Sequence, residues 1–343
     1  MKKSLVALAV LAASGAAMAQ SSVTLFGVVD AAYAVGNGSI SDKTQLRNSG
    51  YNSSRLGFRG TEDLGGGMKA SFWLEAGVAN DDGTGSASSA LNQAQTASNV
   101  GTQGLTFNRR STVSLESGMG ELRLGRDYTP HFWSETVYDP FGTNGVGTTL
   151  TFGKGGLTGV RASNSIGYLS PSMGGVKLWA QTYMGENAST AAKVGNGNSY
   201  RITFDQGKMS LAYAGSSTTT GAGTTNKTSN IAGSYDLGVA KLMAQSNTTE
   251  ITGAADIKSS LIGAHVPMAG GTFRIASSQT DQAGKKAKLM AVGFVKPMSK
   301  RTDLYATYAR VSNSGGSAVA LNGSATAANA SSTGYEFGVK HAF

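Results

Sequence analysis

The side chains best suited to act on a solute are arginines that recur in short segments of alternating polarity. Between Ser54 and Arg59, Leu56 and Phe58 share one face, while Arg55 and Arg59 share the other. A guanidinium stays charged at any relevant pH. Arginines gathered on one surface would therefore attract or bind anions.

The same alternation extends to two further arginine-bearing segments. Arg161 lies on the face opposite Ile166. Arg110 lies opposite Val113 and Leu115, and Arg109 would then point the other way unless a β-bulge shifts the register. An arginine facing lipid at mid-membrane costs about 2–4 kcal/mol, so the arginines are expected on a wet face.

Carboxylates near these arginines are the candidate counter-charges. Glu75 shares the polar face of its segment, and Asp127, Glu135 and Asp139 follow one another at the start of a long polar stretch. Any one of them could serve equally well as a solvated charge or as half of an ion pair that stiffens the chain.

Catalysis and metal binding find little support in the sequence. The three histidines, His131, His265 and His341, lie on distant segments, no cysteine is present, and no histidine pair has metal-ligand spacing. The sequence predicts no enzyme and no cofactor. A protease or lipase built on an outer-membrane barrel is the remaining enzymatic alternative.

The first residues predict an exported protein. Lys2 and Lys3 precede a short apolar run, and Ala17-Met18-Ala19 is a small-x-small cleavage site. We expect residues 1–19 to be a signal peptide and residues 20–343 to form one domain. A membrane anchor is the alternative, but the apolar run is well short of the ~20 residues that a spanning helix needs.

The rest of the chain alternates between short strands and turns. Strands of period two are joined in turn by short Gly-, Pro- and Asp-containing connections and by long polar stretches such as 36–50, 216–229 and 279–287. About sixteen strands can be counted. The pattern predicts an all-β protein, a closed antiparallel transmembrane β-barrel, since only a closed sheet leaves no unpaired backbone groups in lipid. A secreted β-sandwich or β-helix is the soluble alternative.

Net charge limits the classes of partner that the protein could bind. The formal net charge of +9 is compatible with nucleic acid, anionic membrane or anionic solutes. An exported protein rarely meets nucleic acid, and no long Lys/Arg run occurs, so nucleic acid is not expected as a partner.

Trp73, Trp133 and Trp179 are candidates for aromatic girdles at the membrane interfaces, although simple packing would explain each of them as well.

Five segments of the chain resemble one known family. They are residues 22–30 (SVTLFGVVD), 54–75 (SRLGFRGTEDLGGGMKASFWLE), 107–127 (FNRRSTVSLESGMGELRLGRD), 170–178 (SPSMGGVKL) and 338–343 (GVKHAF). The sequence resembles the general porins of Gram-negative bacteria, in particular the β-proteobacterial branch with its anion-selective outer-membrane porins. The resemblance implies a sixteen-stranded barrel in the outer membrane, a homotrimer, passive diffusion of small hydrophilic solutes, and a third long loop folded into the lumen.

The resemblance also implies where solutes pass. It places a basic cluster on the wall opposite the folded-in loop, and it places carboxylates of that loop in the lumen. The candidate constriction residues are Arg55, Arg59, Arg109, Arg110 and Arg161 on the basic side, and Glu75, Asp127, Glu135 and Asp139 on the acidic side. The loop carries few acids, and rings of arginine favour anions, so a preference for anions is expected.

The last strand carries a further mark. Tyr335, Phe337, Val339, His341 and the terminal Phe343 share one face. They would face lipid, and we interpret His341 and Phe343 as the signal by which the outer-membrane assembly machinery recognises barrels. Lipid and lipopolysaccharide are the expected surroundings. The functional alternative is a non-conducting barrel that serves as an adhesin or surface scaffold, which conductance in a planar bilayer would distinguish.

Overall fold

The computed structural model describes residues 22–87, 91–92, 104–150, 154, 156–188 and 193–343. The predicted signal peptide, residues 1–19, lies outside the described residues. The strands are β1 (Ser22–Asn37), β2 (Lys43–Asn48), β3 (Arg55–Gly65), β4 (Met68–Ala79), β5 (Thr84–Gly85), β6 (Arg110–Ser117), β7 (Gly120–Tyr128), β8 (Arg161–Leu169), β9 (Val176–Tyr183), β10 (Gly197–Gln206), β11 (Met209–Gly221), β12 (Thr224–Asp236), β13 (Lys241–Ile251), β14 (Ile257–Met268), β15 (Gly271–Gln282), β16 (Lys285–Pro297), β17 (Thr302–Ser314) and β18 (Ser332–Ala342).

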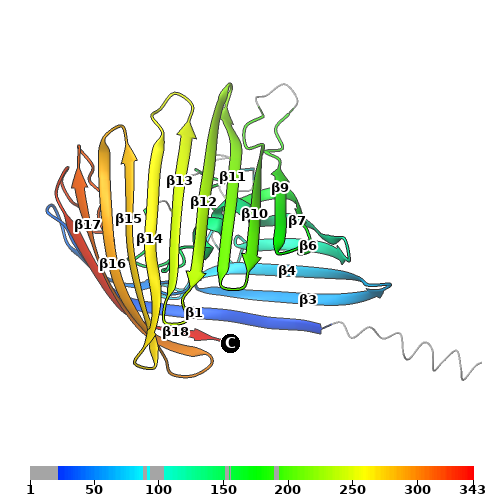
Figure 1. Cartoon of the computed structure of the whole chain (residues 1–343), viewed down its shortest axis with the longest axis horizontal. Coiled ribbons are helices and arrows are strands. Elements are labelled where there is room, and N and C mark those ends of the chain that lie inside the picture. The colour runs from blue at the N-terminus through cyan, green and yellow to red at the C-terminus, as the bar shows by residue number, and fades with distance from the viewer. Residues whose placement is uncertain (1–21, 88–90, 93–103, 151–153, 155, 189–192) are drawn as a thin grey trace, which may run out of the picture.

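The strands form one antiparallel sheet that closes on itself (Figure 1). Strands adjacent in sequence pair with one another, and β1 pairs with β18 from Val28↔Ala342 to Asn37↔Thr333. Both β2 and β3 pair with β1, so together they make one barrel strand interrupted at residues 49–54. The two-residue β5 pairs only with the end of β4. Counted this way, the barrel has the sixteen strands that the sequence predicted.

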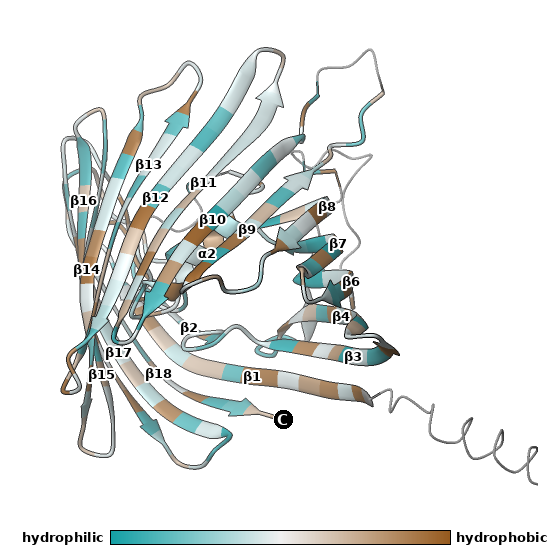
Figure 2. Ribbon diagram, turned by 45° about the vertical axis from the view of Figure 1, so that its right-hand side comes forward, coloured by the Kyte–Doolittle hydropathy of each residue, from teal (hydrophilic) through white to brown (hydrophobic). Residues whose placement is uncertain are grey.

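Hydrophobic and hydrophilic residues alternate along many strands (Figure 2), and because successive side chains point to opposite faces, the barrel has two different surfaces. In β13, Leu242 is exposed on the outside, whereas Gln245 and Asn247 are buried on the inside. Large apolar side chains are exposed along most strands, as expected where a barrel meets lipid rather than water. No helix in the described part of the chain is long and apolar enough to cross a membrane.

Three stretches predicted as long loops are partly strand. Residues 36–50 include β2, residues 216–229 are largely the ends of β11 and β12, and residues 279–287 are nearly all β15 and β16. Their hairpins extend the wall on the side of the long connections (Figure 1). The prediction failed because the strands there are polar on both faces, so the apolar repeat of period two disappears while the hydrogen-bonded ladder continues.

The described part of the connection between β7 and β8, residues 129–150, 154 and 156–160 (loop 3 below), folds into the lumen. Its helix α2 (Pro130–Val137) begins at Thr129, whose Oγ1 accepts a hydrogen bond from the backbone N of Phe132 at 3.3 Å, and Pro130 suits the first turn. The helix contacts β10, β11 and β12. This inward course confirms the predicted third loop.

Polar contacts fasten α2 to the inner wall. The His131 backbone N donates to Ser199 Oγ at 3.1 Å, and Ser134 Oγ donates to Asn230 Oδ1 at 2.7 Å. Gln245 Nε2 donates to the Glu135 backbone oxygen at 3.1 Å. Farther along loop 3, Phe141 and Val146 pack in an apolar cluster with side chains of β14 to β17. The barrel's buried core is therefore the seam between loop 3 and the far wall.

Candidate functional site: the lumen constriction

The arginine wall is organised around Glu75 of β4. Arg109 Nε donates to Glu75 Oε1 at 2.5 Å, and Arg55 Nη1 lies 3.6 Å from the same oxygen. Trp73 Nε1 donates to Glu75 Oε2 at 3.1 Å. One carboxylate is thus shared by two guanidinium groups and an indole.

Tyr128, at the end of β7, joins a third arginine to this group. Its hydroxyl accepts hydrogen bonds from Arg109 Nη2 at 2.8 Å and from Arg161 Nη2 at 2.7 Å. The Arg161 guanidinium also lies 4.2 Å from the Tyr128 ring centroid. We call Arg55, Arg109, Arg161, Glu75 and Tyr128 the arginine wall. Because it contains three guanidinium groups and one carboxylate, it carries an excess of positive charge.

Arg109 and Arg110 both face the lumen because β6 begins with an irregular register. Arg110 is the register partner of Glu75, and the Arg109 backbone N also donates to the Glu75 backbone oxygen at 3.1 Å. Two residues opposite one define a β-bulge, which turns consecutive side chains to the same side. The simple alternation that pointed Arg109 outward was therefore wrong, and the bulge weighed as its alternative is present.

A second set of charges lies beside the wall. Arg123 donates to Asp127 Oδ2 at 2.7 Å and to Glu121 Oε1 at 2.8 Å, and Arg110 Nε lies 3.7 Å from Asp127. Asp127 is thus engaged by two arginines. With two arginines and two carboxylates, this second set of charges is more nearly balanced than the arginine wall.

The tryptophans lie inside the barrel, which contradicts their prediction as interface girdles. Trp73 stands between two guanidinium groups: the Cζ atoms of Arg59 and Arg110 lie 5.1 and 4.6 Å from its ring centroid. The Cζ atom of Arg123 lies 5.7 Å from the ring centroid of Trp179. Parity explains Trp73, since the adjacent Phe72 is on the outer face. Arg59 therefore belongs with Trp73 rather than with the arginine wall.

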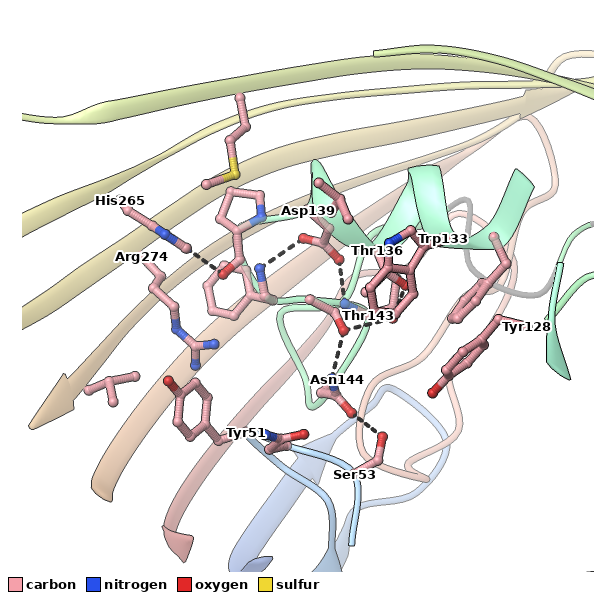
Figure 3. Close-up of a pocket in the computed structure, with 18 of the residues that line it drawn as sticks. Tyr51, Ser53, Tyr128, Trp133, Thr136, Asp139, Thr143, Asn144, His265 and Arg274 are labelled. Atoms are coloured by element: carbon pink, nitrogen blue, oxygen red, sulfur yellow. Dashed lines mark hydrogen bonds between the residues drawn. The ribbon is translucent and has the colours of Figure 1, made fainter. Parts of the chain in front are cut away.

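The opposite wall contributes a basic residue that the sequence analysis missed. Arg274 of β15 is buried, with its guanidinium 4.7 Å from the Tyr51 ring centroid and 4.6 Å from that of Phe141 (Figure 3). Nearby, His265 Nε2 lies 2.7 Å from the Pro140 oxygen. The alternation of Phe273 with Arg274 carried the signal, because an apolar side chain facing lipid turns its neighbour inward.

Glu135 and Asp139, the acids of loop 3, are both buried, so they do not present free carboxylates to the lumen as expected, although Asp139 lines the larger hollow. The Asp139 carboxylate accepts backbone hydrogen bonds from Phe141 at 2.9 Å, Thr143 at 3.0 Å and Thr149 at 3.2 Å. Glu135 is on the face of α2 that packs against the wall and is 4% exposed. The turn needs an acceptor for its backbone N–H groups, and the helix must present one face to the barrel, so both carboxylates are used internally.

Burial also changes the protonation of this helix. Loss of water around Glu135, reinforced by the negative charge of Asp139, raises the pKa of Glu135 well above its usual range. Burial lowers the pKa of His131 to about 4. Both effects favour neutral side chains beneath α2, so this helix adds little charge to the lumen.

Two hollows meet at the arginine wall. One, of about 750 Å³, runs along loop 3 to Arg274 and His265, and the other, of about 470 Å³, runs past Trp73 and Trp179 to the turn after β8. They share three lining residues, which are Arg55, Tyr128 and Trp133. The boundary between the hollows is therefore an arginine facing two aromatic side chains. Within the described residues, no group of three or more metal-ligating side chains exists.

A closed barrel of sixteen antiparallel strands, apolar outside, polar inside and narrowed by an inward loop, defines the class of outer-membrane porins. The chain belongs to the Gram-negative porin family, whose model matches residues 4–316. It is accordingly an outer-membrane protein of a Gram-negative bacterium. The named relatives are porins, which are channels and not enzymes.

Individual relatives resemble the chain over most of its length. It is 39% identical to Outer membrane porin protein 32 of Delftia acidovorans, with all of both chains covered. It is 27% identical to an outer membrane porin of Bordetella pertussis, with 89% of this chain and 93% of the relative covered. A solved structure described as an anion-selective porin from Comamonas acidovorans matches with a TM-score of 0.83 and 34% identity, covering 94% of this chain and 100% of that one.

Proposed function

We propose that the protein forms a water-filled channel in which small hydrophilic solutes diffuse passively and anions are favoured over cations. The observation that carries the proposal is the pairing of a basic wall with a loop whose acids are buried. The arginine wall has one carboxylate for three guanidinium groups, and the Asp139 and Glu135 carboxylates serve loop 3 itself.

The sign of the field follows from this excess of guanidinium charge. Guanidinium groups lining a narrow, water-filled passage lower the energy of an anion there and raise that of a cation. The effect weakens with salt, because the Debye length is about 10 Å at 0.1 M ionic strength. We therefore expect the anion preference to be strongest in dilute salt. The similar structure from Comamonas acidovorans is described as anion-selective, which supports the same sign here.

The zero-current potential across a KCl gradient in a planar bilayer tests this proposal. The wild-type protein is expected to show an anion-selective potential, and Arg55→Ala combined with Arg161→Ala is expected to shift it toward cations. Lys288→Ala with Arg310→Ala is a matched control, since it removes two cations from the exposed outer surface. A wild-type potential of cationic sign, or an arginine variant that behaves like the control, would overturn the proposal.

The non-conducting alternative predicts a different result in the same apparatus. An adhesin or scaffold barrel would give no ion-permeable steps after insertion. The two hollows that meet at Arg55, Tyr128 and Trp133 favour a conducting lumen.

We further propose a homotrimer. Tyr33, Ile40 and Leu46 are each more than half exposed near the ends of β1 and β2, which gives an apolar surface suited to a second copy. Analytical ultracentrifugation in detergent should give three chains per particle, and a monomer would contradict this assembly.

The outer surface also suits lipopolysaccharide. Lys258, Lys286 and Lys288 line an outward groove of about 530 Å³ at the ends of β14 and β16, where the long connections begin. Lysines at that height can pair with lipid phosphates. Native mass spectrometry should detect bound lipopolysaccharide, and triple Ala substitution should reduce it. An unchanged amount of bound lipid would remove the support for this contact.

The terminal residues fit the proposed assembly signal. Phe343 is exposed, and its backbone exchanges hydrogen bonds with Gly27 at 3.0 and 3.1 Å, while His341 Nδ1 lies 2.9 Å from Thr302 Oγ1. Deleting Phe343 should lower the amount of folded barrel in the outer membrane. Normal amounts of folded protein would contradict this role.

A further inference from the structure

Trp133 is the only exposed residue of α2. On α2, the neighbouring Phe132, Ser134 and Glu135 are buried, whereas Trp133 is 38% exposed. Trp133 lines both hollows, together with Arg55 and Tyr128. The loop therefore faces the arginine wall with an aromatic ring.

Tyr128, Phe132 and Trp133 form a shelf of packed rings. The centroids of Tyr128 and Phe132 are 5.3 Å apart in a stacked arrangement, and those of Tyr128 and Trp133 are 5.5 Å apart. The backbone N of Trp133 donates to the Thr129 oxygen at 3.1 Å, and two arginines hold the Tyr128 hydroxyl. The shelf is thus fixed before any solute arrives, which reduces the entropy lost on binding. Figure 3 shows Trp133 and Tyr128 across the pocket from His265 and Arg274.

The smaller hollow beside this shelf is rich in cations and in aromatic rings. Five cationic side chains line it, against the two carboxylates of Glu75 and Asp127, and Trp73 and Trp179 line it too. Arg201 has a buried Nε without a hydrogen-bond partner among the described residues. The five cations are Arg55, Arg110, Arg123, Arg201 and Lys177.

This combination matches one class of solute. A flat aromatic ring can stack on Trp133, and a carboxylate on that ring can reach a guanidinium, which binds carboxylates with paired hydrogen bonds. A cavity of about 470 Å³ holds a one-ring acid together with water. A small inorganic anion gains the charge interaction but not the stacking.

We infer that the constriction is a binding subsite for planar aromatic carboxylates, with Trp133 stacking on the ring and Arg55 and its basic neighbours holding the carboxylate. The inference rests on the proposed anion channel and adds a solute class to it. Such a subsite holds its solute briefly where the two hollows meet. An aromatic acid therefore reduces the chloride current while it occupies the pore.

Block of the chloride current by added acids tests the subsite. Purified protein in a planar bilayer is titrated with sodium benzoate and with sodium cyclohexanecarboxylate, which has the same charge and a similar size but no aromatic ring. One aromatic stacking contact corresponds to a preference of about threefold to tenfold, so benzoate should block at a correspondingly lower concentration. Trp133→Ala should abolish the preference, and Trp133→Phe should keep part of it. Tyr308→Ala, on the exposed outer face of β17, is the matched control and should keep it in full.

The outcomes separate this inference from the proposed function. Equal block by the two acids in the wild-type protein would overturn the subsite, while an anion-selective zero-current potential in the same membranes would leave the anion channel standing. A preference that survives Trp133→Ala would also overturn it. Should Trp133→Ala fail to fold, Trp133→Leu takes its place beside Trp133→Phe, since leucine fills space without an aromatic face.

Discussion

The arginine wall and the foot of loop 3, by which we mean α2 with the Asp139–Gly142 turn, use charge in opposite ways. In the wall, Arg55, Arg109 and Arg161 surround a single carboxylate at the edge of both hollows. In the foot, carboxylates are buried against backbone N–H groups or the barrel. Charged side chains build a field in one region and hold the chain in place in the other.

The difference teaches that selectivity depends on which charges remain accessible, and not on how many each region contains. A carboxylate engaged by several N–H groups is neutralised locally by their dipoles. One that faces water keeps its effect on a passing ion. Two kinds of substitution test this difference between the regions. One loosens the foot, and the other changes the charge balance of the wall.

The largest effect is expected from Asp139→Ala. It removes the acceptor for three backbone donors at Phe141, Thr143 and Thr149, and hydrogen bonds to a charged group contribute about 1.5–3 kcal/mol each. Loop 3 should loosen, with larger and noisier single-channel conductance and faster proteolysis within the loop. Single-channel recording and limited proteolysis measure these two consequences.

The matched variant is Asp139→Asn, which keeps one carbonyl acceptor and should fall between Asp139→Ala and the wild type. Because Asp139 contributes little accessible charge, the sign of the zero-current potential should stay anionic in both variants. A quiet channel of wild-type conductance in Asp139→Ala would show that the foot does not depend on this carboxylate.

A smaller effect is expected from Glu75→Gln in the wall. Glutamine keeps an acceptor for Arg109 but removes the only negative charge of the cluster, so the wall gains one unit of net positive charge. A unit charge at 4 Å in water is equivalent to about 1 kcal/mol, so the anion-to-cation permeability ratio should rise a few-fold.

The control for this change is Glu250→Gln, an exposed residue at the far end of β13. It alters the formal charge of the protein by the same amount at a distance from the wall. If both variants shift the zero-current potential equally, total charge rather than the wall would govern selectivity.

The fold was largely predictable from the sequence because the bilayer imposes a repeat of period two. Leu56 and Phe58, or Phe273 and Ile275, are apolar since they face lipid, and their neighbours must then face the lumen. The inward orientation of Arg55 and Arg161 was predicted from this rule, and so was the number of barrel strands. Where lipid no longer contacts the wall, as at the ends of β11 and β12, the repeat and the prediction were lost together.

The site was less predictable because its decisive features are local departures from that repeat. Arg109 enters the lumen through a bulge that alternation does not reveal. Asp139 and Glu135 lie on an irregular loop, where sequence spacing does not tell which way a carboxylate turns. Trp133 is the exposed position of a helix only two turns long, too short for its pattern to identify the buried face.

The smallest effect at neutral pH is expected from His131. Its protonation state affects the stability of the foot only in acid. Burial holds the pKa of His131 near 4, below its usual value of 6.5, so the foot accommodates the neutral imidazole. The stabilisation is fully present above about pH 6.5 and is lost as the pH falls through about 4. Glu135, whose pKa is raised, acts in the other direction and favours the foot as the pH falls.

Current noise recorded between pH 7 and pH 4 therefore distinguishes the two groups. Noise that increases toward pH 4 is expected from His131, because a protonated ring would have to leave its buried position beneath α2, where its Nε2 has no hydrogen-bond partner among the described residues. His131→Gln should flatten this rise, while His341→Gln, which changes an exposed histidine outside the barrel, should keep the wild-type profile. A rise that persists in His131→Gln would assign the acid response to another group. A wild-type channel that becomes quieter in acid would show that the Glu135 contribution is the larger of the two, so the foot is held by its carboxyl group more than by its imidazole.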